Sequence, residues 1–205
     1  KLLTKIVGNE FANEQFPFGT GKTLNFKEVS IWFQRLSYVG ELGWELYIPI
    51  KDAKNIYEII DKEGKSFDLV HAGAHAMDIM RMEKGYLHWG HDISPGENPY
   101  EAGLGFAVKI NKENDFIGKE SLIELKDNQK KQFAMFTLDQ ANPGYPLLLH
   151  DEPIYYEGKI VGETTSGNFS FNYNKNMAFG YIKPNINIKV AKDHFFERTL
   201  NNFMT

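Results

Sequence analysis

The first half of the chain alternates between strand-like and helix-like hydrophobic patterns. The runs 29–36 and 44–50 are rich in β-branched and aromatic residues, and a short loop with two glycines separates them. This pattern predicts two paired strands. Isoleucines then recur at helical spacing between Asp52, the expected N-cap, and Gly64, the expected stop. A second amphipathic helix is predicted over 72–84, with a glycine directly after it.

The pattern changes after Lys131. Before this point the sequence predicts a strand over 106–110 and a short helix over 119–127. Beyond it, short strand-like runs are separated by Pro, Gly, Asn and Asp at turn positions; the runs are 132–138, 145–150, 154–156, 160–166 and 177–182. Strands with this spacing are typical of an antiparallel barrel or sandwich.

These patterns predict an α+β protein with two domains. We place the boundary near Asn128, so that an α+β domain spans 1–127 and an all-β domain spans 128–205. The first 22 residues show neither a period of 2 nor one of 3.6, as expected for a connection entered midway. We therefore interpret the chain as part of a longer protein whose α+β domain is incomplete at its N-terminus.

Composition narrows the class of protein. The 205 residues are 42% hydrophobic and 24% charged, which is typical of a globular protein. The formal net charge of −4 argues against nucleic-acid binding, because phosphate neutralisation requires a basic surface. No apolar run approaches the roughly 20 residues that span a bilayer, and no signal-peptide pattern is present, so we expect no membrane partner and a cytoplasmic location.

The familiar catalytic motifs are missing from the sequence. It contains no nucleophile elbow, no phosphate-binding glycine loop and no zinc-protease helix motif, and the absence of cysteine excludes thiolate chemistry and disulfides. Four histidines suggest one metal hypothesis, because His71 and His75 are four residues apart and His88 and His91 follow. Isolated histidines are more often packing or surface residues, so we predict no metal site.

Several motifs together carry a more specific signal. The segments are 37–49 (SYVGELGWELYIP), 80–93 (MRMEKGYLHWGHDI), 98–106 (NPYEAGLGF), 116–122 (FIGKESL), 151–167 (DEPIYYEGKIVGETTSG) and 178–182 (AFGYI). In order and spacing they resemble the glycine-cleavage T-protein (aminomethyltransferase) family. The motifs GELGWELY and WGHD are most similar to those of the branch formed by the dimethylglycine and sarcosine dehydrogenases, whose carboxy-terminal region binds folate.

The resemblance implies a fold and an activity. The fold would be a ferredoxin-like α+β layer followed by an antiparallel β-barrel, present here in part. The activity would be transfer of a one-carbon unit from an N-methyl amine, of the dimethylglycine or sarcosine type, to tetrahydrofolate. Folate and the amine would be the small-molecule partners, and the N-terminal part of the same protein would complete the module. FAD would belong only to a further upstream domain.

The resemblance also implies a cofactor-binding set of Tyr38, Glu45 and Arg81. A reduced pterin presents N–H donors that a carboxylate can accept, and the motif assigns that role to Glu45. Tyr38 would line the same pocket and Arg81 would lie near the folate. Without the resemblance, Glu45 is an exposed strand carboxylate, Tyr38 a turn aromatic, and Arg81 a solvated helix charge paired with Asp78.

The sequence departs from the family at the catalytic centre. The family's catalytic aspartate belongs to an N-terminal segment that has no counterpart in these 205 residues, so the catalytic residues are unknown and the chain alone is expected to be inactive. Two alternatives therefore stay open. One is a non-catalytic folate-fold scaffold or regulatory subunit, and the other is a demethylase that acts on another methyl donor.

Overall fold

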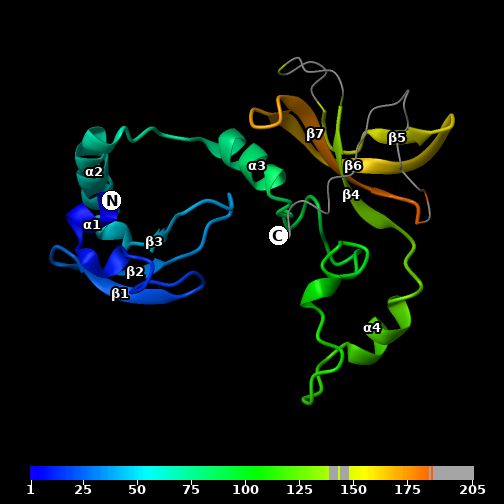
Figure 1. Cartoon of the computed structure of the whole chain (residues 1–205), viewed down its shortest axis with the longest axis horizontal. Helices are drawn as coiled ribbons and strands as arrows, with labels where there is room; N and C mark the ends of the chain where they lie inside the picture. Colours follow the sequence, from blue (N-terminus) through cyan, green and yellow to red (C-terminus); the bar gives the residue numbers. More distant parts are fainter. Residues whose placement is uncertain (139–142, 144–147, 185, 187–205) are drawn as a thin grey trace. The chain divides into compact units, whose positions relative to one another are not determined.

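A computed structural model describes residues 1–138, 143, 148–184 and 186. The chain forms two compact units, Lys1–Met77 and Asp78–Thr205, and the boundary between them falls inside one helix. Both units mix helices with antiparallel sheets, so the predicted α+β class is confirmed (Figure 1). The predicted domain boundary near Asn128 stays a prediction.

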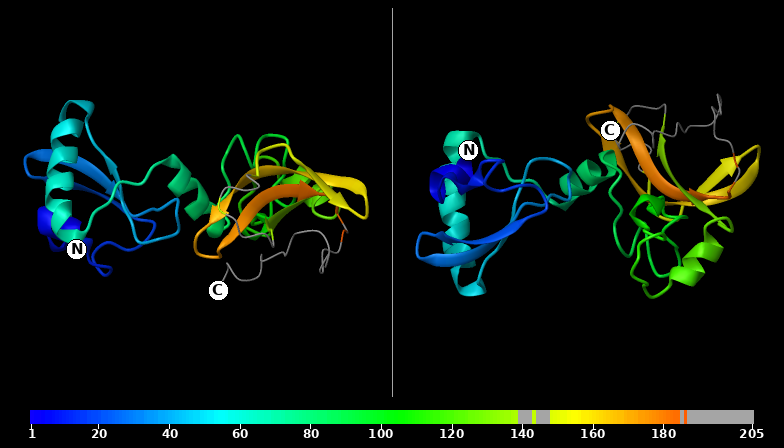
Figure 2. Two further views of the ribbon diagram at one scale, coloured as in Figure 1. Left: turned by 90° about the horizontal axis from the view of Figure 1, so that it is seen from above. Right: turned by 60° about the horizontal axis from the view of Figure 1, so that its bottom comes forward.

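The first unit is a three-stranded antiparallel sheet covered on one face by a long helix. The strands are β1 (Gly21–Phe26), β2 (Val29–Gln34) and β3 (Glu45–Tyr47), in the order β1-β2-β3. The helix is α2 (Ile50–Gly64), and both views of Figure 2 show it lying across the sheet. Alternation along β2 buries Ile31 and exposes Trp32, so one face of the sheet packs on the helix and the other is open.

The predicted hairpin of strands is confirmed, but the N-terminal segment was missed. It contains α1 (Leu2–Ile6), the short 3-10 helix η1 (Asn9–Phe11) and then β1. Phe11 and Phe16 fill the core beneath the sheet, and the Phe11 ring lies 5.1 Å from that of Phe33. Elements this short contain too few residues to show a hydrophobic period. Contacts with residues distant in the chain stabilise them instead.

The ends of α2 differ from the prediction. The helix begins after Pro49, and Asp52 lies in its first turn, where a carboxylate is favourable at the positive end of the helix dipole. At the other end Gly64 is the last helical residue, and the chain continues into the 3-10 helix η2 (Lys65–Phe67). A Cβ on Gly64 would lie 2.3 Å from Leu69 Cδ2, so this glycine allows a close contact.

The second unit is built on a four-stranded antiparallel sheet. Its strands are β4 (Gln132–Thr137), β5 (Pro153–Tyr156), β6 (Lys159–Ser170) and β7 (Lys175–Ile182), in the order β4-β7-β6-β5. They match the predicted runs, except that the run 145–150 lies largely outside the described residues and its described part, 148–150, is not a strand. Within the described residues the strands form an open sheet and no closed barrel.

Both faces of this sheet are buried. Helix α3 (Ala74–Glu83) places Ile79 and Met82 against one face, where Phe133 and Phe179 also lie. The other face carries a second apolar cluster around Ala134 and other small or branched residues. The predicted helix over 72–84 is thus confirmed, and so is the helix predicted from Lys119, observed as α4 (Lys119–Leu125).

The strand predicted over 106–110 is wrong. This segment begins in the 3-10 helix η3 (Gly105–Ala107), and the Phe106 side chain is 61% exposed. Its backbone hydrogen bonds are local: Ala107 donates to the Leu104 carbonyl and Val108 to that of Gly105. Turn hydrogen bonds therefore satisfy the backbone groups that a partner strand would otherwise have bonded.

Candidate functional site

Glu45 lies on the open face of the β1-β2-β3 sheet. It begins β3, pairs with Gln34 of β2, and its side chain is exposed. Its neighbour Trp44 faces the core, with its ring 5.4 Å from that of Phe11. The side chains of Trp44 and Glu45 therefore point to opposite faces of the sheet, and the carboxylate is accessible to a ligand.

Tyr47 shares this face and is bonded to Glu45. The two residues are two apart in a strand, so their side chains point to the same side, and the Tyr47 hydroxyl donates to Glu45 Oε2 at 2.8 Å. This hydrogen bond and the negative charge of Glu45 raise the pKa of Tyr47. Within the described part of the chain no other donor bonds the Glu45 carboxylate, which keeps further acceptor positions for a ligand.

Trp32 adds a second aromatic surface beside this carboxylate. It is the cross-strand partner of Tyr47, and the two side chains are 44% and 54% exposed. A Cβ on Gly21 would lie only 2.2 Å from Trp32 Cζ2, so the indole lies against β1 at a position where a side chain would displace it. The open face therefore combines two exposed aromatic rings with one carboxylate.

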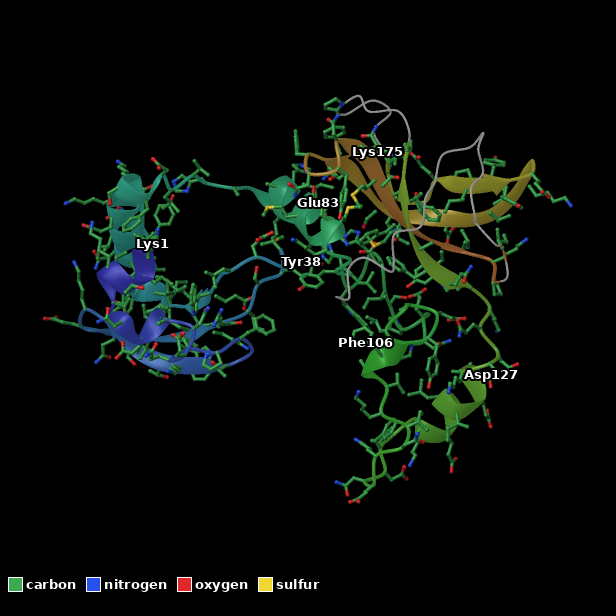
Figure 3. All side chains as sticks on the ribbon, viewed as in Figure 1. Lys1, Tyr38, Glu83, Phe106, Asp127 and Lys175 are labelled. Carbon is green, nitrogen blue, oxygen red and sulfur yellow. The ribbon has the colours of Figure 1, made fainter. Side chains whose placement is uncertain are left out.

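Tyr38 lies in the loop that joins β2 to β3 (Figure 3). Its side chain is partly buried, and the turn is supported by the Val39 amide, which donates to Ser37 Oγ at 3.3 Å. The same loop carries Glu41, which is exposed. Tyr38 and Glu45 thus come from one loop and its following strand, and a shared folate pocket stays a prediction.

Arg81 is almost fully buried in the second unit, at 1% exposure. Its Nε and one terminal nitrogen donate to Asp78 Oδ1 at 2.9 and 2.7 Å, and the other terminal nitrogen donates to the Tyr86 carbonyl at 2.9 Å. The two remaining N–H groups bond Asp92 Oδ2 and Ser166 Oγ. All five guanidinium donors therefore have partners within the chain.

Asp92 is the centre of this buried network. Its Oδ1 accepts hydrogen bonds from the hydroxyls of Thr165 and Ser166, at 2.6 and 2.7 Å. Its Oδ2 accepts from the His88 amide at 2.9 Å as well as from Arg81. The network fastens α3 and the loop after it to β6, so it fixes the conformation of the segment that carries the WGHD motif.

The position of Arg81 bears on both interpretations of it. The pairing with Asp78 is found, but the side chain is buried rather than solvated. A direct contact with folate stays a prediction. Because every donor is already bonded, the geometry favours a positioning role, in which Arg81 holds the loop around Asp92 in place.

Glu83 at the end of α3 is a second buried carboxylate (Figure 3). It accepts hydrogen bonds from Ser170 Oγ at 2.5 Å and from the Asn172 amide at 3.3 Å, and the Asn172 side chain also donates to it. Glu83 lies on the same side of α3 as the apolar Ile79, and it fastens α3 to the hairpin between β6 and β7.

Three of the histidines considered as metal ligands contact other side chains of the protein. His71 bonds Asp61 through Nε2 at 2.9 Å, and the rings of His88 and His91 lie 4.5 Å apart. No group of three or more His, Cys, Asp or Glu in the described residues has a geometry that could hold a metal ion.

Among the described residues, none of the helices combines the length and the apolar character needed to cross a membrane.

Two family models match the chain. The GCVT N-terminal domain matches residues 1–112, and the glycine cleavage T-protein C-terminal barrel domain matches residues 131–196. The chain therefore belongs to the glycine cleavage T-protein family, as its motifs indicate. Mitochondrial dimethylglycine dehydrogenase of Mus musculus is 36% identical over 185 residues, which are 89% of this chain and 21% of that protein.

Further similarities agree with this membership. Mitochondrial sarcosine dehydrogenase of Homo sapiens is 35% identical over 182 residues, covering 88% of this chain and 19% of that protein. The crystal structure of glycine cleavage system aminomethyltransferase T from Bartonella henselae superimposes with a TM-score of 0.74 at 25% identity, covering 89% of this chain and 48% of that one. The chain thus spans about a fifth of the two dehydrogenases. Both are named as mitochondrial, and the cytoplasmic location stays a prediction.

Proposed function

We propose that this chain is the tetrahydrofolate-binding part of an aminomethyltransferase-like enzyme, which transfers a one-carbon unit from an N-methyl amine to tetrahydrofolate. The observation that carries the proposal is the exposed Glu45 carboxylate, held by Tyr47 and flanked by Trp32 on an open sheet face. Membership of the T-protein family supports the same conclusion.

The open face fits the chemistry of a reduced pterin. A carboxylate has about four acceptor positions, and Tyr47 occupies one of those of Glu45, so a pair of pterin N–H donors can be accepted by the others. The exposed rings of Trp32 and Tyr47 offer apolar surface to a planar heterocycle. Glu45 would therefore orient the pterin, and the aromatic rings would shield it from water.

The other two predicted residues have different roles in this proposal. Tyr38, from the loop before β3, would contact the folate from the same unit as Glu45. Arg81 would act through Asp92 and Ser166, by holding the loop that follows α3. When bound, tetrahydrofolate supplies the nitrogen atoms that accept the one-carbon unit.

The activity of the whole protein is part of the proposal. The catalytic aspartate would be supplied by the remainder of the T-protein module, and FAD, where the whole protein uses it, by a further domain. The donor would be an N-methylated amine, because the chain is similar to the dimethylglycine and sarcosine dehydrogenases.

The binding of folate is tested by replacing Glu45 in the full-length protein. Charge-assisted hydrogen bonds contribute about 1.5–3 kcal/mol, so Glu45→Gln is expected to weaken tetrahydrofolate binding by about 10- to 150-fold in titration calorimetry. Glu41→Gln is the matched control, because Glu41 is an exposed carboxylate of the same motif. Unchanged affinity in Glu45→Gln, or a larger loss in Glu41→Gln, would remove Glu45 from the site.

The catalytic part of the proposal needs a separate assay. The full-length protein is incubated with tetrahydrofolate and dimethylglycine or sarcosine, and methylenetetrahydrofolate is followed above its spontaneous rate of formation. Folate binding without turnover of any amine would favour the scaffold or regulatory subunit. Turnover with a donor other than an N-methyl amine would favour the alternative demethylase.

A further inference from the structure

A concave site lies in the second unit, around η3 and α4. It is a cavity of about 430 Å³ between the turn after Pro99, the segment that follows η3, and the first residues of α4. Its walls are mostly apolar, and they include Ala107, Lys109, Lys112, Phe116 and Leu122. Glu45, Tyr38 and Arg81 are all absent from these walls.

The size and lining of the cavity are those of a small-molecule site. Ligand pockets in proteins have volumes of about 300–1,000 Å³ and combine mainly apolar walls with a few polar groups that orient the ligand. Six of the eight lining residues are apolar, and Phe116 provides an aromatic wall. The body of a ligand here would be apolar or aromatic.

The charge of the lining indicates the polar group of the ligand. Both charged residues that line the cavity, Lys109 and Lys112, are basic, and neither Asp nor Glu lines it. Lys109 Nζ donates only a long hydrogen bond, 3.4 Å, to the Phe106 carbonyl, and Lys112 Nζ lies 4.7 Å from the centre of the Phe116 ring. Within the described residues neither lysine forms an ion pair with a carboxylate, so both ammonium groups can accept an anionic partner.

From this combination we infer that the cavity binds a small organic acid, with its apolar or aromatic body against Phe116 and Leu122 and its carboxylate at Lys109 and Lys112. The lysine stems add apolar contact area while their ammonium groups stay at the wet rim. The inference is independent of the proposed folate site, because none of the residues that line the cavity belongs to the set of Tyr38, Glu45 and Arg81.

The head group of the ligand is tested with three compounds that share one body. The purified chain, labelled with 15N, is titrated with 4-phenylbutyrate, 4-phenylbutan-1-ol and 4-phenylbutylamine, and amide shifts are followed by NMR. We expect saturable shifts at residues of the cavity, with the acid binding most tightly and the amine most weakly. Equal binding of acid and alcohol, or shifts spread over the whole chain, would overturn the proposal.

Variants test the place of binding. Exposed ion pairs are weak, so Lys109→Gln and Lys112→Gln should each weaken binding of 4-phenylbutyrate by about 2- to 5-fold. Lys54→Gln, on the outer side of α2, is the matched control and should leave binding unchanged.

A cavity-filling variant tests whether the ligand occupies the cavity itself. Ala107→Trp places an indole in the cavity and should abolish binding. Circular dichroism and thermal melting establish that each variant is folded, and normal binding in folded Ala107→Trp would contradict the proposal.

A competition experiment separates this site from the folate site. Tetrahydrofolate is added to the chain already saturated with 4-phenylbutyrate, and the shifts of the cavity residues are followed. Persistence of the shifts supports two separate sites. If tetrahydrofolate displaces the acid at concentrations that fill the proposed folate site around Glu45, the cavity is not a separate site. The proposed folate function would remain intact.

Discussion

Arg81 of α3 and Asp92 of the following loop form an ion pair in which both side chains are excluded from solvent, at 1% and 0% exposure. The pair is further bonded to the hydroxyl of Ser166 on β6. Removing one member of a buried pair takes away the closest counter-charge of the other, and such changes are strongly destabilising. Arg81 and Asp92, which belong to the motif 80–93, therefore contribute mainly to the stability of the second unit.

Asp92→Asn is expected to lower the free energy of unfolding by about 3 kcal/mol, because Arg81 loses its fully buried counter-charge and keeps only that of the partly exposed Asp78. Urea unfolding followed by circular dichroism measures the loss. Asp115→Asn is the control: Asp115 is 87% exposed and lies 3.7 Å from Lys119, so its change should stay within about 1 kcal/mol. Equal effects of the two substitutions would show that the buried pair contributes little.

Gly180→Ala is expected to disrupt the pairing of β6 with β7. A Cβ at Gly180 would lie 2.4 Å from the Glu163 carbonyl oxygen, a backbone atom that cannot move without shifting its strand. Inserting a methyl group into a packed region costs about 1–3 kcal/mol, and a backbone contact places this substitution at the upper end or beyond. Thermal unfolding of the variant measures the change.

The control for Gly180 is Gly73→Ala. No heavy atom lies within 4 Å of the position that a Cβ at Gly73 would occupy. This substitution should be neutral, or should stabilise the chain by about 0.4–1 kcal/mol through the unfolded state. If Gly180→Ala proved as harmless as Gly73→Ala, the glycine of the AFGYI motif would have no packing role.

The sequence predicts the elements that have a helical period or clear turn residues at their ends, and misses those that have neither. Helices α2 and α3 were predicted because their apolar residues repeat at helical spacing, and most strands of the second unit were predicted because turn residues separate strand-like runs. Strand β1 and the segment around Phe11 were missed, since long-range aromatic contacts stabilise them. The apolar run at Phe106 was wrongly predicted as a strand, because a run of that length does not reveal whether a partner strand exists.

The candidate site divides in the same way. The strand pattern was enough to predict that Glu45 is exposed, and the spacing of three residues on one helix was enough to predict the pairing of Arg81 with Asp78. The network around Asp92 was missed, because its partners Thr165 and Ser166 are more than 70 residues away in the chain. The sequence offered one signal for this network: Asp92 belongs to the motif 80–93, and Thr165 and Ser166 belong to the motif 151–167.

The stability of the chain should depend on the ionisation of Glu97. Burial acts to raise the pKa of this carboxyl, but hydrogen bonds from Lys131, at 2.5 Å, and from Ser94 outweigh it, so the pKa lies below its usual value of 4.5. A lowered pKa in the folded state means that the ionised group stabilises the fold above pH 4.5. That contribution is lost as the pH falls through the folded pKa.

Comparison with Glu97→Gln isolates this contribution. The variant should be less stable than the original chain at about pH 7, and the difference should shrink as the pH is lowered below 4.5. Urea unfolding of both proteins at a series of pH values measures it. A difference that stayed constant over the whole series would mean that the charge of Glu97 is not what stabilises its contacts.

The hydrogen bond between Tyr47 and Glu45 links ionisation to the proposed folate site. The bond and the charge of Glu45 hold the pKa of Tyr47 above its usual value of 10.0, because losing the phenol proton breaks the bond and places two negative charges together. In Glu45→Gln the pKa of Tyr47 should fall toward 10.0. NMR titration with ring-labelled tyrosine measures this, and an unchanged pKa would show that the bond does not persist in solution.

Tyr47→Phe should in turn weaken tetrahydrofolate binding by the full-length protein. Without the hydroxyl, the Glu45 carboxylate is no longer held in one orientation, and the loss of one hydrogen bond corresponds to about 2- to 10-fold in affinity. The effect should be smaller than that of Glu45→Gln, because the carboxylate itself remains. Tyr57→Phe, at an exposed tyrosine of α2, is the control and should bind normally. Tighter binding by Tyr47→Phe would mean that Tyr47 competes with the pterin for Glu45 rather than positioning it.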